Sequence, residues 1–276
     1  MIVLCWNCRG MGNARTVRAL KDAIDSHHPQ VICLIETKLH HEKWDWMRVR
    51  LGFRNCFVVD PKGSAGGLAV LWKSEVSLTI RNYSRFHVDA VSGASFQSRL
   101  TLFYGNLIVS KRKESWNLIR TLESLQSGPW VLLGDFNEVF KDSEVHRVHQ
   151  RNQWQIEAFR RVIGECGLID LGYLGHPFTF SNRRRGNLET KARLDRVFVN
   201  KAWLDAGMEY QVMHLTAIGS DHSPILFCPK AGEISGLDRS FRFEPMWLRH
   251  GNFMNIVAES WEGSRDGPKL YESETQ

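Results

Sequence analysis

Short apolar runs that end in a polar residue constrain the fold of this chain more than any other feature. Residues 131–133 read Val-Leu-Leu and lead directly into Gly134-Asp135-Phe136-Asn137. Side chains alternate along a strand, so we expect positions 135 and 137 to point to the same side. A carboxylate that takes a proton, beside an amide that orients water, suits metal-assisted hydrolysis. Turn capping explains Asp and Asn at a strand end equally well, so the motif needs support from the rest of the chain.

Polar residues stand in a similar position in five other apolar runs. Strands that each present one polar group at an end build a site on a rigid sheet. Each residue alone is explained equally well by turn or capping chemistry, but the ordered set favours a functional site. These residues are Asn7 after 2–6, Glu36 after 31–35, Tyr104 within 103–106, Asp195 within 193–199, and Asp221 with His222 before 223–227.

The order of predicted elements indicates an α/β fold. Apolar periodicity predicts helices over residues 15–26, 112–126 and 152–165. The first half of the chain mixes strands and helices, and the second half repeats that plan. This pattern fits two sheets packed face to face with helices outside. Strands are expected near residues 2–6, 31–35, 55–60, 67–72, 76–80, 87–92, 99–105, 130–134, 178–181, 193–199, 210–215 and 224–228.

Composition narrows the class of protein. A length of 276 residues with 43% hydrophobic residues and ten Trp excludes a disordered chain and suits one large domain. The formal charge of +6 favours a polyanionic partner. No signal peptide is recognisable, and no apolar run approaches the roughly 18 residues of a membrane span, so we expect an intracellular protein without a membrane partner.

Cysteine usage also points to the inside of a cell. The six cysteines are scattered, which is typical of reduced, buried thiols. Cys5 and Cys8 form a C-x-x-C, but no second pair with ligand spacing follows. Residues three apart in a strand face opposite sides, so we do not expect a metal or redox pair here.

Five segments carry a resemblance to a known family. They resemble the endonuclease domain of plant LINE-type (non-LTR) retrotransposons, within the endonuclease/exonuclease/phosphatase superfamily. The resemblance runs from about residue 2 to residue 228 and implies a four-layered α/β sandwich, with two packed mixed sheets flanked by helices. The segments are Trp6-Asn7-Cys8-Arg9-Gly10-Met11-Gly12, Glu36-Thr37-Lys38, Gly66-Gly67-Leu68-Ala69-Val70-Leu71-Trp72-Lys73, Gly134-Asp135-Phe136-Asn137-Glu138 and Ser220-Asp221-His222.

The resemblance also implies a domain division. Residues 1–230 correspond to the endonuclease domain, and residues 231–276 to a linker-like tail that we expect to be poorly ordered. Within this tail, residues 241–247 look like the segment that precedes a reverse transcriptase. The chain stops before any polymerase begins, which suggests a fragment or a gene derived from a retroelement.

The resemblance implies a first group of residues around a metal ion. Glu36 would be the main Mg²⁺ ligand, with Mn²⁺ as an alternative ion, and Asn7 and Asp221 would support the metal. Tyr104 would lie against the phosphate.

The second group acts on water and phosphate. Asp135 would position or deprotonate the attacking water, and Asn137 would hold the phosphate or that water. His222 would contact the scissile phosphate, with its ring oriented by Asp195. Family resemblance leaves open which group acts as the base.

Two basic runs are candidates for contacts with DNA. Arg183, Arg184 and Arg185 lie between a predicted strand and the Asp195 strand, in a region where related retroelement nucleases carry a hairpin that enters a DNA groove. Lys111 and Arg112 form part of the other run. Such contacts position a duplex through its phosphates without reading its sequence. Solvated loops account for basic runs equally well.

The chain departs from the family pattern at two places near the site. Arg9 stands two residues after Asn7, where apurinic endonucleases carry an aspartate that assists the metal, so abasic-site repair is in doubt. The proline that usually follows the tyrosine is absent, and residues 105–109 replace it in a loop on the substrate side.

These observations lead to one main hypothesis and two alternatives. We expect a Mg²⁺-dependent endonuclease that nicks duplex DNA and leaves a 3′-hydroxyl, acting as a monomer in the nucleus and needing no small-molecule cofactor. One alternative is a phosphatase or exonuclease of the same fold. The other is a catalytically silent, retroelement-derived remnant that only binds nucleic acid.

Overall fold

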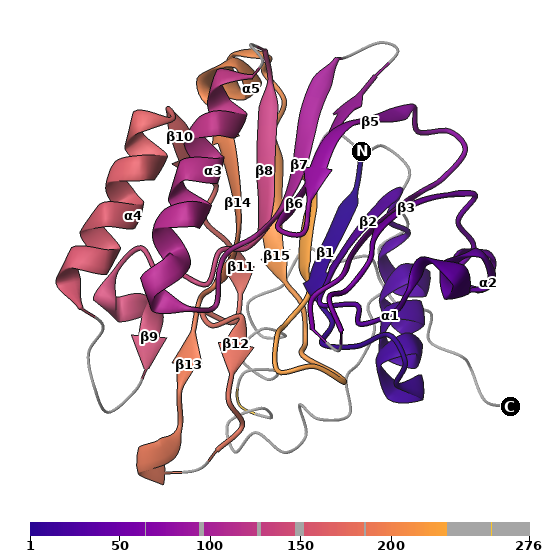
Figure 1. Cartoon of the computed structure of the whole chain (residues 1–276), viewed down its shortest axis with the longest axis horizontal. Helices are drawn as coiled ribbons and strands as arrows, with labels where there is room; N and C mark the ends of the chain where they lie inside the picture. Colours follow the sequence, from indigo (N-terminus) through magenta and orange to yellow (C-terminus); the bar gives the residue numbers. More distant parts are fainter. Residues whose placement is uncertain are drawn as a thin grey trace, which may run out of the picture. The chain divides into compact units, whose positions relative to one another are not determined.

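A computed structural model gives the arrangement of the chain (Figure 1). It describes residues 1–63, 65–93, 97–125, 128–146, 152–184, 186–230 and 255. Contacts divide the chain into two units, Met1–Glu233 and Ile234–Gln276. The first unit carries every element below. Apart from Asn255, the tail expected over residues 231–276 lies outside the described residues.

One large sheet contains the N-terminal strand. It is mixed, because β1 runs parallel to β2 and antiparallel to β16. Its seven strands, in spatial order, are β11 (Leu174–Gly175), β15 (Tyr210–His214), β16 (Ile225–Pro229), β1 (Val3–Asn7), β2 (Val31–Ile35), β4 (Leu68–Trp72) and β3 (Asn55–Val59).

The other large sheet contains the Asp135 strand. It has six strands, in the order β10 (Leu168–Asp170), β14 (Asp195–Asn200), β8 (Trp130–Asp135), β7 (Ser98–Tyr104), β6 (His87–Ser92) and β5 (Leu78–Ser84). A small third sheet is formed by β12 (Phe180–Ser181), β13 (Lys191–Ala192) and β9 (Val145–His146).

Helices cover the outer faces of both large sheets. Figure 1 shows α1 and α2 on one side of the paired sheets and α3 and α4 on the other. The helices are α1 (Ala14–His27), α2 (Trp44–Arg50), α3 (Arg112–Ser124), α4 (Gln153–Glu165) and the short α5 (Lys201–Asp205). Single 3₁₀ turns are η1 (His41–Lys43), η2 (Val109–Lys111), η3 (Asp142–Glu144) and η4 (Gly186–Leu188).

Both faces of the central strands are buried, which explains their continuous apolar runs. In β8, Val131 and Leu133 belong to the core between the two sheets, whereas Leu132 packs into the core under α3 and α4. In the other sheet, Cys5 lies between the sheets and Trp6 lies under α1. Strands covered on both faces lose the apolar–polar alternation of half-exposed strands. The predicted four-layered α/β sandwich is therefore confirmed.

The elements largely match the expected ones. The three predicted helices are present within two residues at each end, and residues 55–72 form the expected antiparallel hairpin of β3 and β4. The short strands β9, β10, β11 and β13 were not expected from the sequence, and neither were the helices α2 and α5. Both helices are short, and α2 buries only Trp44 and Met47, which is too few residues to establish a helical period.

The cysteines are free and sit in separate cores. All six lack a disulfide partner. Cys5 lies between the sheets, and Cys8 lies in the core under α1, which confirms that they face different sides. Burial raises the pKa of the Cys8 thiol to about 12, so it stays protonated at neutral pH. In the described part of the chain, no helix is long and apolar enough to cross a membrane.

Sheet topology brings the predicted site residues to one edge. Strand β7 is parallel to β8, with Tyr104 in register with Asp135, and β14 is antiparallel to β8, with Asp195 in register with Asp135. In the other sheet Asn7 pairs with Ile35, so Glu36 follows at the same strand end. Contacts between β1 and β8 then place the two strand ends against each other across the sheets.

Gly134 is the one position in β8 that only glycine fits. Its φ is +146°, and a Cβ atom there would lie 1.9 Å from the carbonyl oxygen of Phe103. We predict that Gly134→Ala lowers the free energy of unfolding by about 2 kcal/mol or more, because backbone cannot yield as a side chain can. Urea denaturation measures this change.

The control is Gly164→Ala in α4, where nothing lies within 4 Å of the added Cβ. Replacing glycine by alanine in a helix is neutral or stabilises by up to about 1 kcal/mol. Equal unfolding midpoints for the two variants would contradict the prediction.

Candidate active site

The Asn7 side chain connects the two acidic strand ends. Its amide Nδ2 donates to Glu36 Oε1 at 3.2 Å and to Asp135 Oδ2 at 2.9 Å. Because both acceptors are carboxylates, the orientation of the amide is set. Asn7 is fully buried, and its Oδ1 has no hydrogen-bond partner among the described residues. A buried acceptor without a partner is uncommon and calls for a ligand.

Tyr104 fixes the Glu36 carboxylate from the other side. Its hydroxyl donates to Glu36 Oε1 at 2.8 Å. Burial and the neighbouring Glu36 hold the pKa of Tyr104 well above its ordinary value, so the phenol remains a donor. Glu36 Oε1 thus accepts two hydrogen bonds, and Oε2 faces two cations at longer range, the Arg9 Nε and the Lys38 Nζ, each at 3.7 Å.

Backbone strain is concentrated around these residues. Six described residues other than glycine have positive φ, and five of them lie in the site or in segments that carry it. Non-glycine residues in this region cost free energy and tend to cluster at functional sites. The five are Arg9 (50°), Glu36 (54°), Lys38 (52°), Asn137 (55°) and Arg183 (55°).

Asp135 and Asn137 come together by a turn and not by strand alternation. Strand β8 ends at Asp135, and Asn137 already has a left-handed backbone. The backbone N–H of Asn137 donates to Asp135 Oδ1 at 2.9 Å, and Asn137 Nδ2 donates to the carbonyl of Gly105 at 2.9 Å. The reasoning from strand periodicity was therefore wrong, although the two side chains belong to one hydrogen-bonded turn.

His222 lies between two buried carboxylates. Its Nδ1–H donates to Asp195 Oδ2 at 2.8 Å, and its Nε2 lies 3.8 Å from Asp135 Oδ2. Thr179 Oγ1 accepts a hydrogen bond from the backbone N–H of Asp195 at 3.0 Å, and Trp6 Nε1 donates to the His222 carbonyl at 3.0 Å. Both ends of the Asp195–His222 pair are thus held by neighbouring strands.

Charge balance in this group decides where protons reside. Burial lowers the pKa of His222, but the carboxylates of Asp195 and Asp135 outweigh burial and raise it to about 9. Burial, with Asp195 adding to it, raises the pKa of Asp135 to about 7, although His222 opposes the rise. At neutral pH the site therefore holds a protonated imidazole beside a carboxylate that is ready to exchange a proton.

The Ser220–Asp221 segment closes the site. Ser220 Oγ donates to the carbonyl of Asn7 at 2.7 Å, and the Arg9 guanidinium donates to the Asp221 carboxylate. Arg9 thereby connects Asp221 with Glu36. Among the residues predicted from the sequence, Asp221 is positioned mainly by the hydrogen bond that it accepts from Arg9.

Three contributors were not expected from the sequence, namely Lys38, Thr179 and Ser220, and Arg9 was expected only as a departure from the family pattern. Lys38 and Ser220 adjoin predicted residues, so their position in the quoted motifs was a usable signal. No sequence signal pointed to Thr179, because it accepts hydrogen bonds from backbone N–H groups 15 and 16 residues away in the sequence.

The predicted basic residues have different environments. Lys111 and Arg184 are exposed, and Arg185 lies outside the described residues. The Arg183 guanidinium donates to the Ser220 carbonyl, next to Asp221. Arg112 is buried, and its Nη1 donates to Glu138 Oε2 at 3.2 Å. The structure thus gives Arg112 a partner inside the protein.

Two sets of side chains have donors suited to a metal ion. Asp135, Asp195 and His222 offer ligand atoms that all lie within 4.8 Å of one another. Asn7 and Glu36 offer hard oxygen atoms, and one of these, Asn7 Oδ1, has no partner among the described residues. Oxygen donors of this kind are the ligands that Mg²⁺ prefers.

Comparison with models of known protein families identifies the family of this chain. A family model described as "Endonuclease/Exonuclease/phosphatase family" matches residues 4–222, and this chain belongs to that family. No curated protein matches the sequence.

Solved structures show the same fold. A 3′-5′ exonuclease from Neisseria meningitidis superposes with a TM-score of 0.64 at 18% identity, over 83% of this chain and 99% of that chain. The endonuclease domain of TRAS1, a telomere-specific non-LTR retrotransposon, gives 0.62 at 16%, over 84% and 99%. An AP endonuclease from Leishmania major gives 0.62 at 17%, over 83% and 87%. At such identities, the similarity establishes the fold and no more.

The Asp195–His222 hydrogen bond makes a testable contribution to proton binding. Asp195→Asn should lower the pKa of His222 from about 9 by more than about one unit, because a neutral amide replaces the nearest carboxylate. NMR titration of the His222 ring reports this value. The ring of His41, which pairs with Asp60 on the surface, serves as the internal control. An unchanged His222 titration would contradict this assignment.

The pH dependence of the free energy of unfolding should follow the protonation of His222. The folded-state pKa of about 9 exceeds the ordinary value of 6.5, so the folded state binds more protons between these values. The contribution of protonated His222 is complete below pH 6.5 and is lost as the pH rises through about 9. In Asp195→Asn, urea midpoints measured over this range should fall less steeply than in the wild type.

Proposed function

We propose that this protein is a divalent-metal-dependent endonuclease that nicks duplex DNA and leaves a 3′-hydroxyl. The observation that carries the proposal is the unpartnered Asn7 Oδ1 beside Glu36, within one hydrogen-bonded group that also contains Asp135. Family membership supports a phosphoester hydrolase. The arrangement combines hard oxygen ligands with a group that exchanges protons near pH 7.

Asn7 and Glu36 would hold the metal. Asp221 would support them through Arg9, which contacts both Asp221 and Glu36. Asn7 Oδ1 and Glu36 Oε2 fit Mg²⁺, with Mn²⁺ as the alternative. When bound, the ion would neutralise charge on the phosphate and lower the pKa of a bound water.

The Asp135–Asp195–His222 group suits proton chemistry better than metal binding. The Nδ1–H of His222 is occupied by Asp195, and its pKa of about 9 keeps the imidazole protonated at neutral pH. Metal binding through Nε2 would require the imidazole to lose the proton that the two neighbouring carboxylates favour. We therefore assign the metal to Asn7 and Glu36.

The remaining residues account for the hydrolytic step. Asp135, with its pKa near 7, would orient the attacking water and take its proton, and Asn137 would hold the water or the phosphate. Cationic His222, oriented by Asp195, would contact the scissile phosphate and stabilise charge on it. Tyr104 would lie against the same phosphate while its hydroxyl holds Glu36. The water oxygen would bond to phosphorus as the bond to the 3′-oxygen breaks, and the leaving oxygen would take a proton from solvent, which gives a 3′-hydroxyl and a 5′-phosphate.

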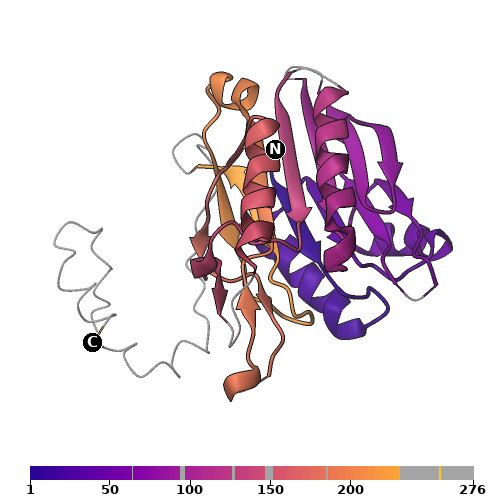
Figure 2. The same ribbon diagram turned by 60° about the vertical axis from the view of Figure 1, so that its left-hand side comes forward.

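Duplex DNA would be positioned by basic residues around the site. Strands β12 and β13 form an arm that extends beyond the two large sheets in both views (Figures 1 and 2). Arg184 is exposed on this arm, and Arg183 connects it to Ser220 beside the site. Together with Lys111, these charges would contact phosphates on the backbone. The buried Arg112 has no part in this contact.

A retroelement origin is part of the proposal. It rests on the resemblance of the sequence to plant LINE-type endonucleases, and the similarity in fold to the TRAS1 endonuclease domain agrees with it. Residues 1–230 would be the nuclease domain, acting as a monomer on nuclear DNA. Nicking would supply the 3′-hydroxyl that primes reverse transcription.

Plasmid nicking tests the reaction. The wild type should convert supercoiled plasmid to open circles with Mg²⁺ and not with chelator. Asp135→Asn and His222→Ala should each lose on the order of 10²- to 10⁴-fold in rate, because each removes a group that acts on the transition state. The control is Glu165→Gln, which alters a surface carboxylate paired with Arg120.

Other results of the nicking assay would favour one of the two alternative functions. Binding of DNA without any nicking would favour a silent remnant. Release of inorganic phosphate from monoesters, with plasmid left intact, would favour a phosphatase of the same fold. Full activity in both variants would contradict the assigned roles.

Metal dependence tests Glu36 separately. Glu36→Gln should raise the Mg²⁺ concentration for half-maximal nicking on the order of 10-fold or more, because a neutral amide replaces the charged ligand. Nicking rates measured against Mg²⁺ concentration give this value. An unchanged half-maximal concentration, matching Glu165→Gln, would show that Glu36 does not hold the metal.

A further inference from the structure

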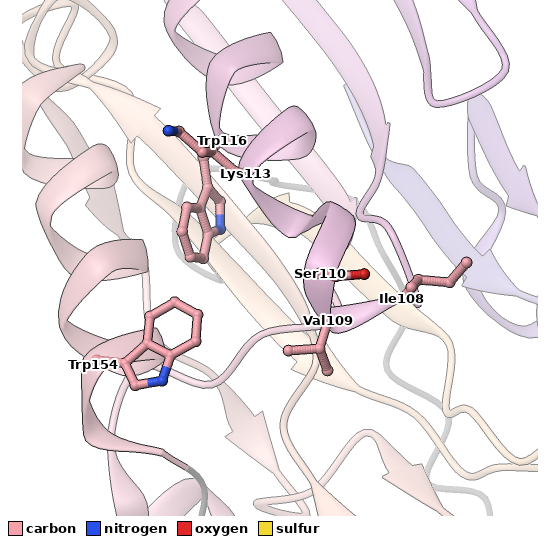
Figure 3. A pocket seen from close by; sticks show the side chains of 6 residues that line it. All are labelled: Ile108, Val109, Ser110, Lys113, Trp116 and Trp154. Carbon is pink, nitrogen blue, oxygen red and sulfur yellow. The ribbon is translucent and has the colours of Figure 1, made fainter.

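An apolar pocket with two tryptophans lies outside the site described above. It has a volume of about 680 Å³. Figure 3 shows the Trp116 ring from α3 next to the Trp154 ring from α4, with Val109 also at the pocket. The described residues that line it are Ile108, Val109, Ser110, Lys113, Trp116 and Trp154.

The pocket presents a stacking face, and one of its lining side chains carries a buried donor that has no acceptor among the described residues. Trp154 is 54% exposed, and its ring meets Trp116 edge to face at 6.4 Å, which leaves a face of Trp154 open. Trp116 is only 8% exposed, and its Nε1–H has no acceptor among the described residues. A buried indole N–H normally finds a partner, so this wall of the pocket calls for a ligand that accepts a hydrogen bond.

Charge around the pocket favours an anionic ligand. Lys113 lines it, Lys111 is exposed two residues earlier, and none of the described lining residues is acidic. A planar aromatic group with a hydrogen-bond acceptor and a linked negative charge satisfies all three features. A nucleotide has this combination.

Topology places the pocket at the same end of the sandwich as Asp135. Strands β7 and β8 are parallel, so α3 must begin at the end where both finish. Strand β10 has the same direction as β8, because both are antiparallel to β14, so α4 also begins at that end. Val109 follows Tyr104 by five positions, which limits the distance between their Cα atoms to about 18 Å.

We propose that this pocket binds an unpaired nucleobase of a single-stranded segment beside the cleavage site, with the strand phosphate on Lys113 and Lys111. The base stacks on Trp154, and a carbonyl oxygen or ring nitrogen accepts the Trp116 Nε1–H. This inference rests on the proposed function in that it takes nucleic acid as the substrate. It adds a preference for duplexes with an unpaired strand near the nick.

Binding of a labelled strand tests the pocket. Fluorescence anisotropy with fluorescein-labelled oligothymidylate, in chelator, should show about 10-fold weaker binding for Trp154→Ala. A blunt duplex of equal length should bind nearly as tightly as it does to the wild type. The matched control is Trp46→Ala, because Trp46 is similarly exposed at 59% but lies on α2, on the other outer face.

Cross-linking locates the base. An oligothymidylate with one 5-iodouracil should cross-link to a peptide that contains Trp154 or Trp116. A cross-link elsewhere, together with equal binding by Trp154→Ala and Trp46→Ala, would overturn the proposal and leave the pocket to an apolar segment of a protein partner.

The nuclease proposal and the pocket proposal can be refuted independently of each other. Trp154 lies outside the catalytic residues, so Trp154→Ala should nick fully paired plasmid at the wild-type rate. Weaker strand binding by Trp154→Ala in a protein that does not nick would support the pocket and refute the nuclease. Nicking by a protein whose Trp154→Ala variant binds strands normally would refute the pocket alone.

Discussion

The Asn7 carboxamide is the interaction on which the arrangement of the site depends. It belongs to one sheet and donates to Glu36 of that sheet and to Asp135 of the other. Two buried carboxylates would repel each other without a shared donor, and the neutral amide supplies it without adding charge. The same contact leaves Asn7 Oδ1 without a partner among the described residues, so one side chain both joins the sheets and carries the oxygen to which we assign the metal.

Buried charge is the second constraint. Asp135 and Asp195 are almost fully buried and pair across β8 and β14, and such a pair is costly unless a cation accompanies it. His222 meets this need by staying protonated between them, as its raised pKa of about 9 shows. The imidazole is thus held by the same electrostatics that would let it act on a phosphate.

Strand polarity decides how far the functional surface extends. Because β7 and β8 are parallel, their ends and the first turn of α3 meet at one edge. Tyr104, Asp135 and the tryptophan pocket all lie at that edge, and the β12–β13 arm is anchored there through Phe180, which bridges to His222. The proposed nucleic-acid surface would therefore extend from the site to the arm and to the pocket.

The sequence by itself determined the layers and the strand ends. The order of helices and strands already indicated two sheets packed face to face with helices outside, and one polar residue at a strand end marked Asn7, Glu36 and Asp135. Only the tertiary structure decided how these groups contact one another. Hydrogen bonds such as Asp195–His222 join residues 27 positions apart, and the pocket joins two helices. Local patterns report which face of an element is buried, whereas distances between elements depend on packing that no local pattern encodes.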